Sequence, residues 1–191
     1  MPAPARTSLD EIVAAGRALV DSEGLDRLTM SAVASAVGIR APSLYKHVPN
    51  RGELVRLIAE TVADELGASL ESSIEGEDPE RDLEALAHAF RRFARSRPEL
   101  YRLVFSPLPE EWRPRREVLA AASEPVLRAV ASLAGPEHAL DGARLVTAWA
   151  HGFMTMELAG AFRLDGDVDL AFAFGIEKIA ASLSTMEAGS G

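Results

Sequence analysis

The chain has 191 residues, 48% of them hydrophobic and 26% charged, which is room for two small domains and enough apolar surface to exclude intrinsic disorder. It contains no cysteine, so disulfides, thiolate catalysis and cysteine-ligated zinc or iron–sulfur sites are excluded. The formal net charge of −9 at pH 7 excludes a uniformly basic surface, so any phosphate-binding region must be local.

Two helices are predicted at the start of the chain. Ser8 and Glu11 match a capping box, and apolar residues then recur at helical spacing until Gly24. Thr29 is the expected N-cap of a short second helix, because its hydroxyl can accept a hydrogen bond from the first turn. Gly38 is expected to end that helix, since glycine adopts the left-handed conformation without a Cβ clash.

Proline and asparagine delimit the next two helices. Pro42 suits the first turn of a third helix, where its missing N–H would have had no partner. That helix is predicted to run through His47 and to end before Pro49. Asn50 is the expected cap of a long fourth helix over residues 51–74, which is expected to connect the N-terminal module to the rest of the chain.

The middle of the chain alternates helices with loops. Pro79 opens a fifth helix after the acidic loop EGEDP, and Pro98 opens a short sixth helix. Residues 106–115, SPLPEEWRPR, contain three prolines and are predicted to form an exposed, lid-like loop. A seventh helix is predicted over residues 115–134, in which Pro125 either introduces a kink or marks the true start.

The last two predicted helices, residues 138–162 and 168–184, are paired across the turn LDGD. No segment shows the alternation of apolar and polar residues that is typical of a strand bounded by turns, so the predicted fold is all-α. The predicted organisation is a three-helix module over residues 1–50, the connecting helix 51–74, and a helical bundle over residues 75–191.

Positive charge is concentrated around the third helix. Between residues 27 and 52 the only charged residues are basic, namely Arg27, Arg40, Lys46 and Arg51. Two helices joined through Gly38 and followed at once by a third meet the description of a helix-turn-helix, in which the second helix of the pair enters the DNA major groove. The sequence therefore predicts a basic DNA-binding module on an otherwise acidic chain.

The segment TMSAVASAVGIRAPSLYKHVPNRGELV resembles the N-terminal domain of tetracycline-repressor (TetR) family regulators. The resemblance extends over residues 8–60. The positions that support it are Ala34, Gly38, Leu44, Tyr45, His47 and Arg51.

This resemblance implies roles for the second and third helices. Phosphate contacts are implied for Thr29, Tyr45, His47 and Arg51, base-facing positions for Ser31, Ala41, Pro42 and Ser43, and either role for Arg40 and Lys46. Ala41 and Pro42 are uncharged, so they suit contact with a thymine methyl group better than hydrogen bonding. Leu44 is expected in the core, and Tyr45 has the alternative of packing against the first helix.

The segment TAWAHGFMTMELAGAF resembles the C-terminal ligand-binding domains of this family that are named for a Trp-His-Gly motif, here Trp149, His151 and Gly152. Such domains imply an apolar cavity. The candidate wall residues are Phe90, Phe93, Leu103, Trp112, Trp149 and Phe153, with His88, His151 or Glu157 as polar contacts. Ordinary core packing is the alternative for each aromatic residue. His88 and His138 match no metal-ligand spacing, so neither a metal nor another cofactor is predicted.

A two-fold dimer is expected, because paired reading heads bind palindromic DNA with half-sites about 34 to 36 Å apart or a multiple of that distance. Helices 138–162 and 168–184 combine apolar faces with small residues that permit close helix approach. These small residues are Ala148, Gly152, Ala159, Gly160, Ala171, Gly175 and Ala180. The alternative is that the same stripe packs within one chain.

These features predict a homodimeric, ligand-responsive transcription regulator, a repressor that binds a palindromic operator on double-stranded DNA and is released by a small apolar molecule. No catalytic arrangement, phosphate loop or dinucleotide fingerprint is present, so an enzyme is not predicted. One alternative is an all-helical carrier or enzyme with an incidental basic patch, and another is a DNA-architectural protein without a sensor. The N-terminus MPAPARTSLDE lacks the features of a secretory leader, so the expected location is the cytoplasm.

Overall fold

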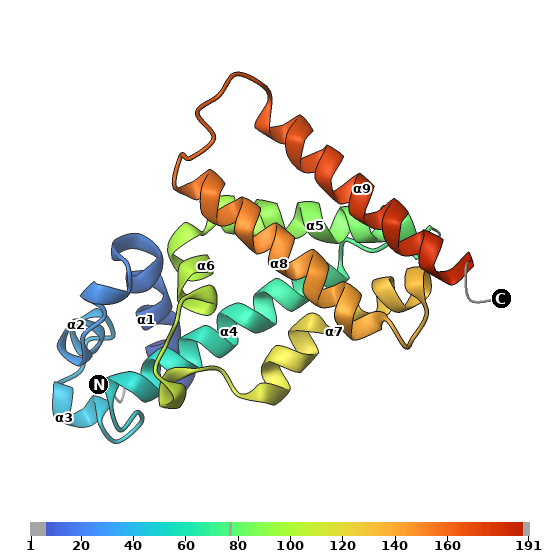
Figure 1. The fold of residues 1–191 in the computed structure, drawn as a ribbon. Coiled ribbons are helices and arrows are strands. Elements are labelled where there is room, and N and C mark those ends of the chain that lie inside the picture. The colour runs from blue at the N-terminus through green and yellow to red at the C-terminus, as the bar shows by residue number, and fades with distance from the viewer. Residues whose placement is uncertain (1–6, 77, 189–191) are drawn as a thin grey trace. The chain divides into compact units, whose positions relative to one another are not determined.

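The computed structural model describes residues 7–76 and 78–188, and over these residues it contains helices and turns but no strand, as predicted (Figure 1). The long helices are α1 (Leu9–Glu23), α4 (Arg51–Glu71), α5 (Pro79–Ser96), α7 (Arg116–Ala134), α8 (Ala139–Leu158) and α9 (Val168–Ala188). The shorter elements are α2 (Met30–Ala36), α3 (Ala41–Leu44), α6 (Pro98–Phe105) and the 3-10 turns η1 (Leu25–Arg27) and η2 (Glu110–Trp112).

The helices form two compact units. The first reaches to Asp64 and also includes Arg97–Leu119, and the second comprises Glu65–Ser96 and the chain from Ala120 onward. The division between these units differs from the expected boundary at residue 75. In the structure α6 and the loop after it belong with the N-terminal helices. In the first unit α6 packs on α1, with Leu100 fully buried and Arg97 paired with Asp21.

Local capping explains how the N-terminal helices begin and end. The backbone N–H of Glu11 donates to Ser8 Oγ at 3.1 Å, and the N–H of Ser8 donates to a Glu11 carboxylate oxygen at 2.9 Å, which confirms the capping box. Thr29 Oγ1 accepts from the N–H of Ala32 at 3.1 Å, as predicted. Gly38 ends α2 with φ of +71°, a conformation in which a Cβ would be strained.

Two predicted helices are shorter in the structure. α3 ends at Leu44 instead of continuing through His47, and the N–H of His47 donates to the carbonyl of Leu44, three residues back, at 2.9 Å. Pro49 has no N–H to continue the helical ladder, so the chain tightens into turns before it. α4 ends at Glu71 instead of residue 74. Just beyond this end, Ser73 Oγ donates to the carbonyl of Leu70 and so competes with backbone N–H groups for that acceptor.

The C-terminal helices also differ from their predicted bounds. α8 ends at Leu158 instead of residue 162, because Gly160 adopts φ of +62° and directs the chain into a helix-ending turn. α9 begins at Val168 as predicted but continues to Ala188 instead of residue 184. Pro125 lies inside α7, so it does not mark the start of that helix.

The core of the second unit lies between α5, α8 and α9. Both α8 and α9 pack along α5, and α9 also contacts α8 (Figure 1). Phe172 and Ile176 of α9 and Met154 of α8 are buried there. Burial of a side chain of this size stabilises the fold by about 1.5 to 3 kcal/mol. Within the described residues no single helix is long and apolar enough to cross a membrane, and α7 with α8 meets the length and composition requirement only as a sharply bent pair.

Candidate functional site

The predicted DNA-binding residues lie in the first unit, from the N-cap of α2 through α2 and α3 to the start of α4. Most of their side chains are exposed, namely those of Thr29, Ser31, Arg40, Pro42, Ser43, Tyr45, Lys46 and His47, whereas Ala41 and Arg51 are half-buried. Leu44 and Val48 are fully buried and anchor α3 to the unit, which confirms the core position predicted for Leu44. Tyr45 is 51% exposed, so half of its side chain is open to solvent, and its role stays a prediction.

Arg51 joins the start of α4 to the start of α2. Its Nε donates to the carbonyl of Leu28 at 2.6 Å, and its Nη2 donates to the carbonyl of Leu25 at 2.8 Å. Leu28 immediately precedes the cap residue Thr29. Two predicted phosphate contacts that are distant in the sequence, Thr29 and Arg51, therefore belong to the same small region of the unit.

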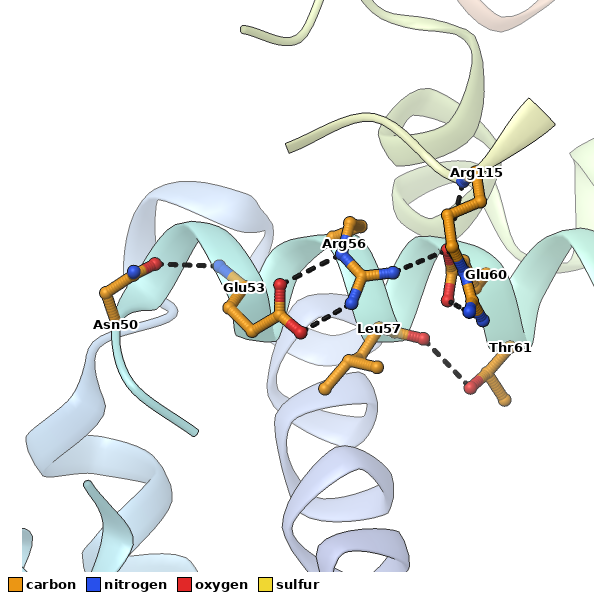
Figure 2. Close-up of polar contacts among 7 residues, drawn as sticks. All are labelled: Asn50, Glu53, Arg56, Leu57, Glu60, Thr61 and Arg115. Atoms are coloured by element: carbon orange, nitrogen blue, oxygen red, sulfur yellow. Dashed lines mark hydrogen bonds and ion pairs between the residues drawn. The ribbon is translucent and has the colours of Figure 1, made fainter. Parts of the chain in front are cut away.

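The first turns of α4 hold a network of paired charges (Figure 2). Asn50 Oδ1 accepts from the N–H of Glu53 at 2.8 Å, which confirms the predicted cap. Glu53 binds Arg56, which also donates to Glu60 at 2.7 Å. Glu60 further accepts from the backbone N–H and Nε of Arg115, each at 2.9 Å. This network pairs Glu53 and Glu60 with arginine side chains.

Glu60 is 5% exposed and remains ionised because of these partners. Burial by itself favours a higher pKa, but the hydrogen bonds from Arg115 and the charge of Arg56 outweigh it, and the pKa of Glu60 lies below its usual value. Arg115 ends the segment 106–115, which the sequence predicts to be exposed or lid-like. Most of its residues are exposed, but Leu108 and Pro114 are buried and the end of the segment is bonded to α4.

The predicted ligand-pocket residues are divided between the units. Leu103 and Trp112 belong to the first unit, whereas Phe90, Phe93, Trp149, His151, Phe153 and Glu157 belong to the second. In the second unit Trp149 and Phe153 meet Phe172 with ring centroids 4.9 and 5.0 Å apart. Phe90 and Phe93 are buried. The structure therefore groups the aromatic residues of α8 around Phe172, which the sequence interpretation did not include.

A buried arginine is the principal residue that the sequence interpretation missed. Arg91 is 5% exposed and donates from Nε and Nη2 to the two carboxylate oxygens of Glu157, at 2.9 and 2.8 Å. It also donates to Asp169 at 2.6 Å, and its guanidinium carbon lies 4.8 Å from the ring centroid of Phe172. Helical spacing could have indicated its burial, because position 91 lies on the same face of α5 as Ala87 and Ala94, which are buried.

His88 faces the same group of side chains. Its ring lies 5.3 Å from that of Phe172, and burial, followed by the charges of Arg91 and Arg92, lowers the pKa of His88. Glu157, predicted as a polar ligand contact, is thus the partner of Arg91. Within the described part of the chain no group of three His, Asp or Glu side chains is arranged to hold a metal ion.

The small residues predicted at a dimer interface do not share one face. Ala180 is fully buried inside the second unit. Gly175 faces Trp149, and a Cβ at this position would lie 2.4 Å from Trp149 Cζ2. The prediction is therefore wrong for Ala180, which packs within the chain, whereas the place of half-buried Gly175 at the interface stays a prediction. Ala148, Gly152, Ala159 and Ala171 are exposed.

Both parts of the chain match known protein families. Residues 12–58 match a family described as bacterial regulatory proteins, tetR family, and residues 83–179 match one described as tetracyclin repressor-like, C-terminal domain. The second match alone covers about half of the 191 residues.

Individual proteins agree with these matches. An uncharacterized HTH-type transcriptional regulator of Mycobacterium tuberculosis is 29% identical over 94% of this chain and 83% of its own length. Tetracycline repressor protein class E of Escherichia coli is 40% identical over 30% of this chain and 28% of its own length. A single-substitution variant of TetR from Acinetobacter baumannii, solved with minocycline, superimposes with a TM-score of 0.71 at 24% identity and covers 95% of this chain and 99% of that one.

Proposed function

Because the chain belongs to the tetR family of bacterial transcription regulators, we propose that it binds a palindromic operator as a homodimer and leaves it when a small apolar molecule binds. The observation that supports this proposal is the exposed side-chain set of α2 and α3. It lies in the part of the chain where every charged residue between positions 27 and 52 is basic.

The proposed contacts divide into two classes. Thr29, Tyr45, His47 and Arg51 bind phosphates, and Ser31, Ala41, Pro42 and Ser43 face bases, with Arg40 and Lys46 able to contribute to either class. The exposed hydroxyls of Tyr45 and Ser43 lie on opposite sides of buried Leu44 in the sequence. A phosphate contact acts on every DNA sequence, whereas a base contact acts on specificity.

Selection of bound sequences from a random duplex pool tests this assignment. We expect a palindromic site from the wild type, a similar site bound more weakly by Tyr45→Ala, and an altered base preference at one symmetric position for Ser43→Ala. An equal loss of affinity for every DNA sequence in both variants would contradict the division into two classes of contact. Affinity for the selected duplex should also fall steeply as salt rises, whereas an enzyme or carrier with an incidental basic patch would show no such site.

The proposed dimer interface uses the exposed apolar side chains of α8 and α9. Leu145 and Met156 of α8 and Leu170 and Phe174 of α9 are each at least 47% exposed. Side chains of this size are expected to be covered by a second copy, because exposed contiguous apolar surface favours association. The exposed Ala148 and Gly152 lie on α8 between Leu145 and Met156 and would permit close approach.

The proposed effector site lies among the aromatic side chains of the second unit, around Trp149 and Phe153. The relative from Acinetobacter was solved with minocycline, and the ActR protein of Streptomyces coelicolor, which has a TM-score of 0.71 to this chain, was solved with (S)-DNPA. An effector that favours one spacing of the two DNA-binding modules would weaken binding about 100-fold with only about 2.7 kcal/mol of coupling. A panel of apolar compounds should therefore contain members that release the selected duplex, and release by none of them would count against this mechanism. DNA binding also implies that the protein acts in the cytoplasm.

A further inference from the structure

The loop between α6 and α7 carries an aromatic side chain into the DNA-binding unit. Trp112 lies on η2, and its indole ring is 5.2 Å from the guanidinium carbon of Arg51. The backbone at Gly52 makes room for this ring, since a Cβ there would lie 2.2 Å from Trp112 Nε1. The sequence predicts Trp112 in the wall of a ligand pocket, whereas in the structure its ring packs against Arg51 and Gly52 at the start of α4.

The loop is fixed on both sides of Trp112. Before it, Leu108 is buried and its carbonyl accepts from Arg113 Nε at 3.0 Å. After it, Pro114 is buried and Arg115 is bonded to Glu60. These contacts hold the indole in one place, so its position against Arg51 is preorganised.

Arg51 is held from two directions in consequence. Its N–H groups donate to the carbonyls of Leu25 and Leu28, and its guanidinium carbon lies over the Trp112 ring. A guanidinium carries five N–H donors, so these two bonds leave donors in the same plane for a phosphate oxygen beside Thr29. Contact with an aromatic face restricts the orientation of a guanidinium, so loss of the indole is expected to weaken binding by up to about tenfold.

We propose that Trp112 is a positioning residue for DNA binding, which acts through Arg51 and holds the guanidinium plane at the start of α2. This inference rests on the proposed function and extends it to a residue outside the helix-turn-helix. It predicts that the loop of residues 106–115 controls the strength of one phosphate contact in each subunit. It also predicts that Trp112 does not affect which bases are read.

A double-mutant cycle tests the proposal. The variants are Trp112→Leu, Arg51→Ala and their combination, and Trp112→Phe is the conservative control that keeps an aromatic face. The readout is affinity for a random-sequence duplex of about 30 base pairs, longer than two adjacent half-sites, measured over a range of salt concentrations. Circular dichroism and thermal unfolding establish that each variant is folded.

We expect Trp112→Leu to weaken binding by up to about tenfold and to reduce the salt slope by about one per affected phosphate contact. Trp112→Phe should retain most of the slope. In the Arg51→Ala background, Trp112→Leu should have little further effect, because both changes remove the same contact. Gly52→Ala, which displaces the indole without removing it, should reproduce the loss of slope.

Two results would overturn the inference. One is additive losses in the cycle, and the other is an unchanged salt slope in a folded Trp112→Leu protein, since a purely structural tryptophan would lower stability without removing a phosphate contact. A wild type that shows no salt-dependent binding to any duplex would instead overturn the proposed function, and this inference with it.

Discussion

Glu60 shows how a single buried carboxylate depends on its partners. It lies on the inner face of α4 and accepts hydrogen bonds from Arg56 and from Arg115, 55 residues further along the chain. Removal of the charge of a buried carboxylate leaves its cationic partners without a counter-charge and with one acceptor oxygen fewer, which is more destabilising than the net value of the pair. The network is therefore expected to contribute both stability and a dependence of stability on pH.

Glu60→Gln should lower the free energy of unfolding by about 1 to 3 kcal/mol at neutral pH. Because the folded-state pKa of Glu60 is lowered, its contribution is present above the unfolded value of 4.5 and is lost as pH falls through the lower folded-state pKa. Urea unfolding at a series of pH values should thus show that the free energy of unfolding falls less at acid pH for Glu60→Gln than for the wild type.

Glu53→Gln is the matched control for that experiment. Glu53 also pairs with Arg56, but its side chain is 31% exposed against 7% for Glu60. The control should lose less stability and keep the acid dependence of the wild type. An identical response of the two variants to pH would show that burial of Glu60 is not the cause.

At the scale of elements, the separation of α8 and α9 is set by one glycine and one tryptophan. Trp149 of α8 occupies the space that a side chain at Gly175 of α9 would need. The ring also contacts Phe172, one turn before Gly175. A large residue facing a small one lets two helices pack without a void.

Gly175→Ala should therefore lower the free energy of unfolding by about 1 to 3 kcal/mol, despite the higher helix propensity of alanine. Thermal unfolding measures this loss. A smaller ring in Trp149→Phe should reduce the effect of Gly175→Ala, and an undiminished effect would refute the packing explanation.

At the scale of the whole molecule, apolar surface and charge are unevenly distributed. The exposed residues Leu170 and Phe174 lie one turn apart on α9, and the ammonium of Lys178 is 5.3 Å from the Phe174 ring. The proposed dimer would cover these side chains, and its two-fold symmetry would use the same patch on both subunits. The basic residues of the predicted DNA-binding module lie in the other unit, so the proposed dimer interface and the proposed DNA contacts belong to different units.

Phe174→Asp should convert the dimer to a monomer, because it introduces an unpaired charge into an apolar interface. Sedimentation equilibrium should show the monomer, and affinity for the selected palindrome should fall strongly while weak binding to random duplex persists. Leu119→Asp, an exposed apolar residue outside α8 and α9, should leave the oligomeric state unchanged. A dimeric Phe174→Asp protein would place the interface elsewhere.

The sequence by itself determined the helical fold and where most helices begin, because those depend on neighbouring residues. Ser8 with Glu11, Thr29 and Gly38 each act within a few positions of themselves, and the structure confirms all three caps. The core position of Leu44 was also predicted, and Leu44 is fully buried. The separate roles of the predicted DNA-binding residues stay predictions.

Only the tertiary structure decided which distant side chains meet. It paired Arg91 with Glu157 and Asp169, 66 and 78 residues away, and it moved Trp112 from a predicted pocket wall to Arg51. Helical periodicity tells which face of a helix is buried, but not which other helix covers it or which charge is carried there. The partners of Arg91, Trp112 and Gly175 therefore depend on how whole helices pack, which is a property that no local sequence pattern contains.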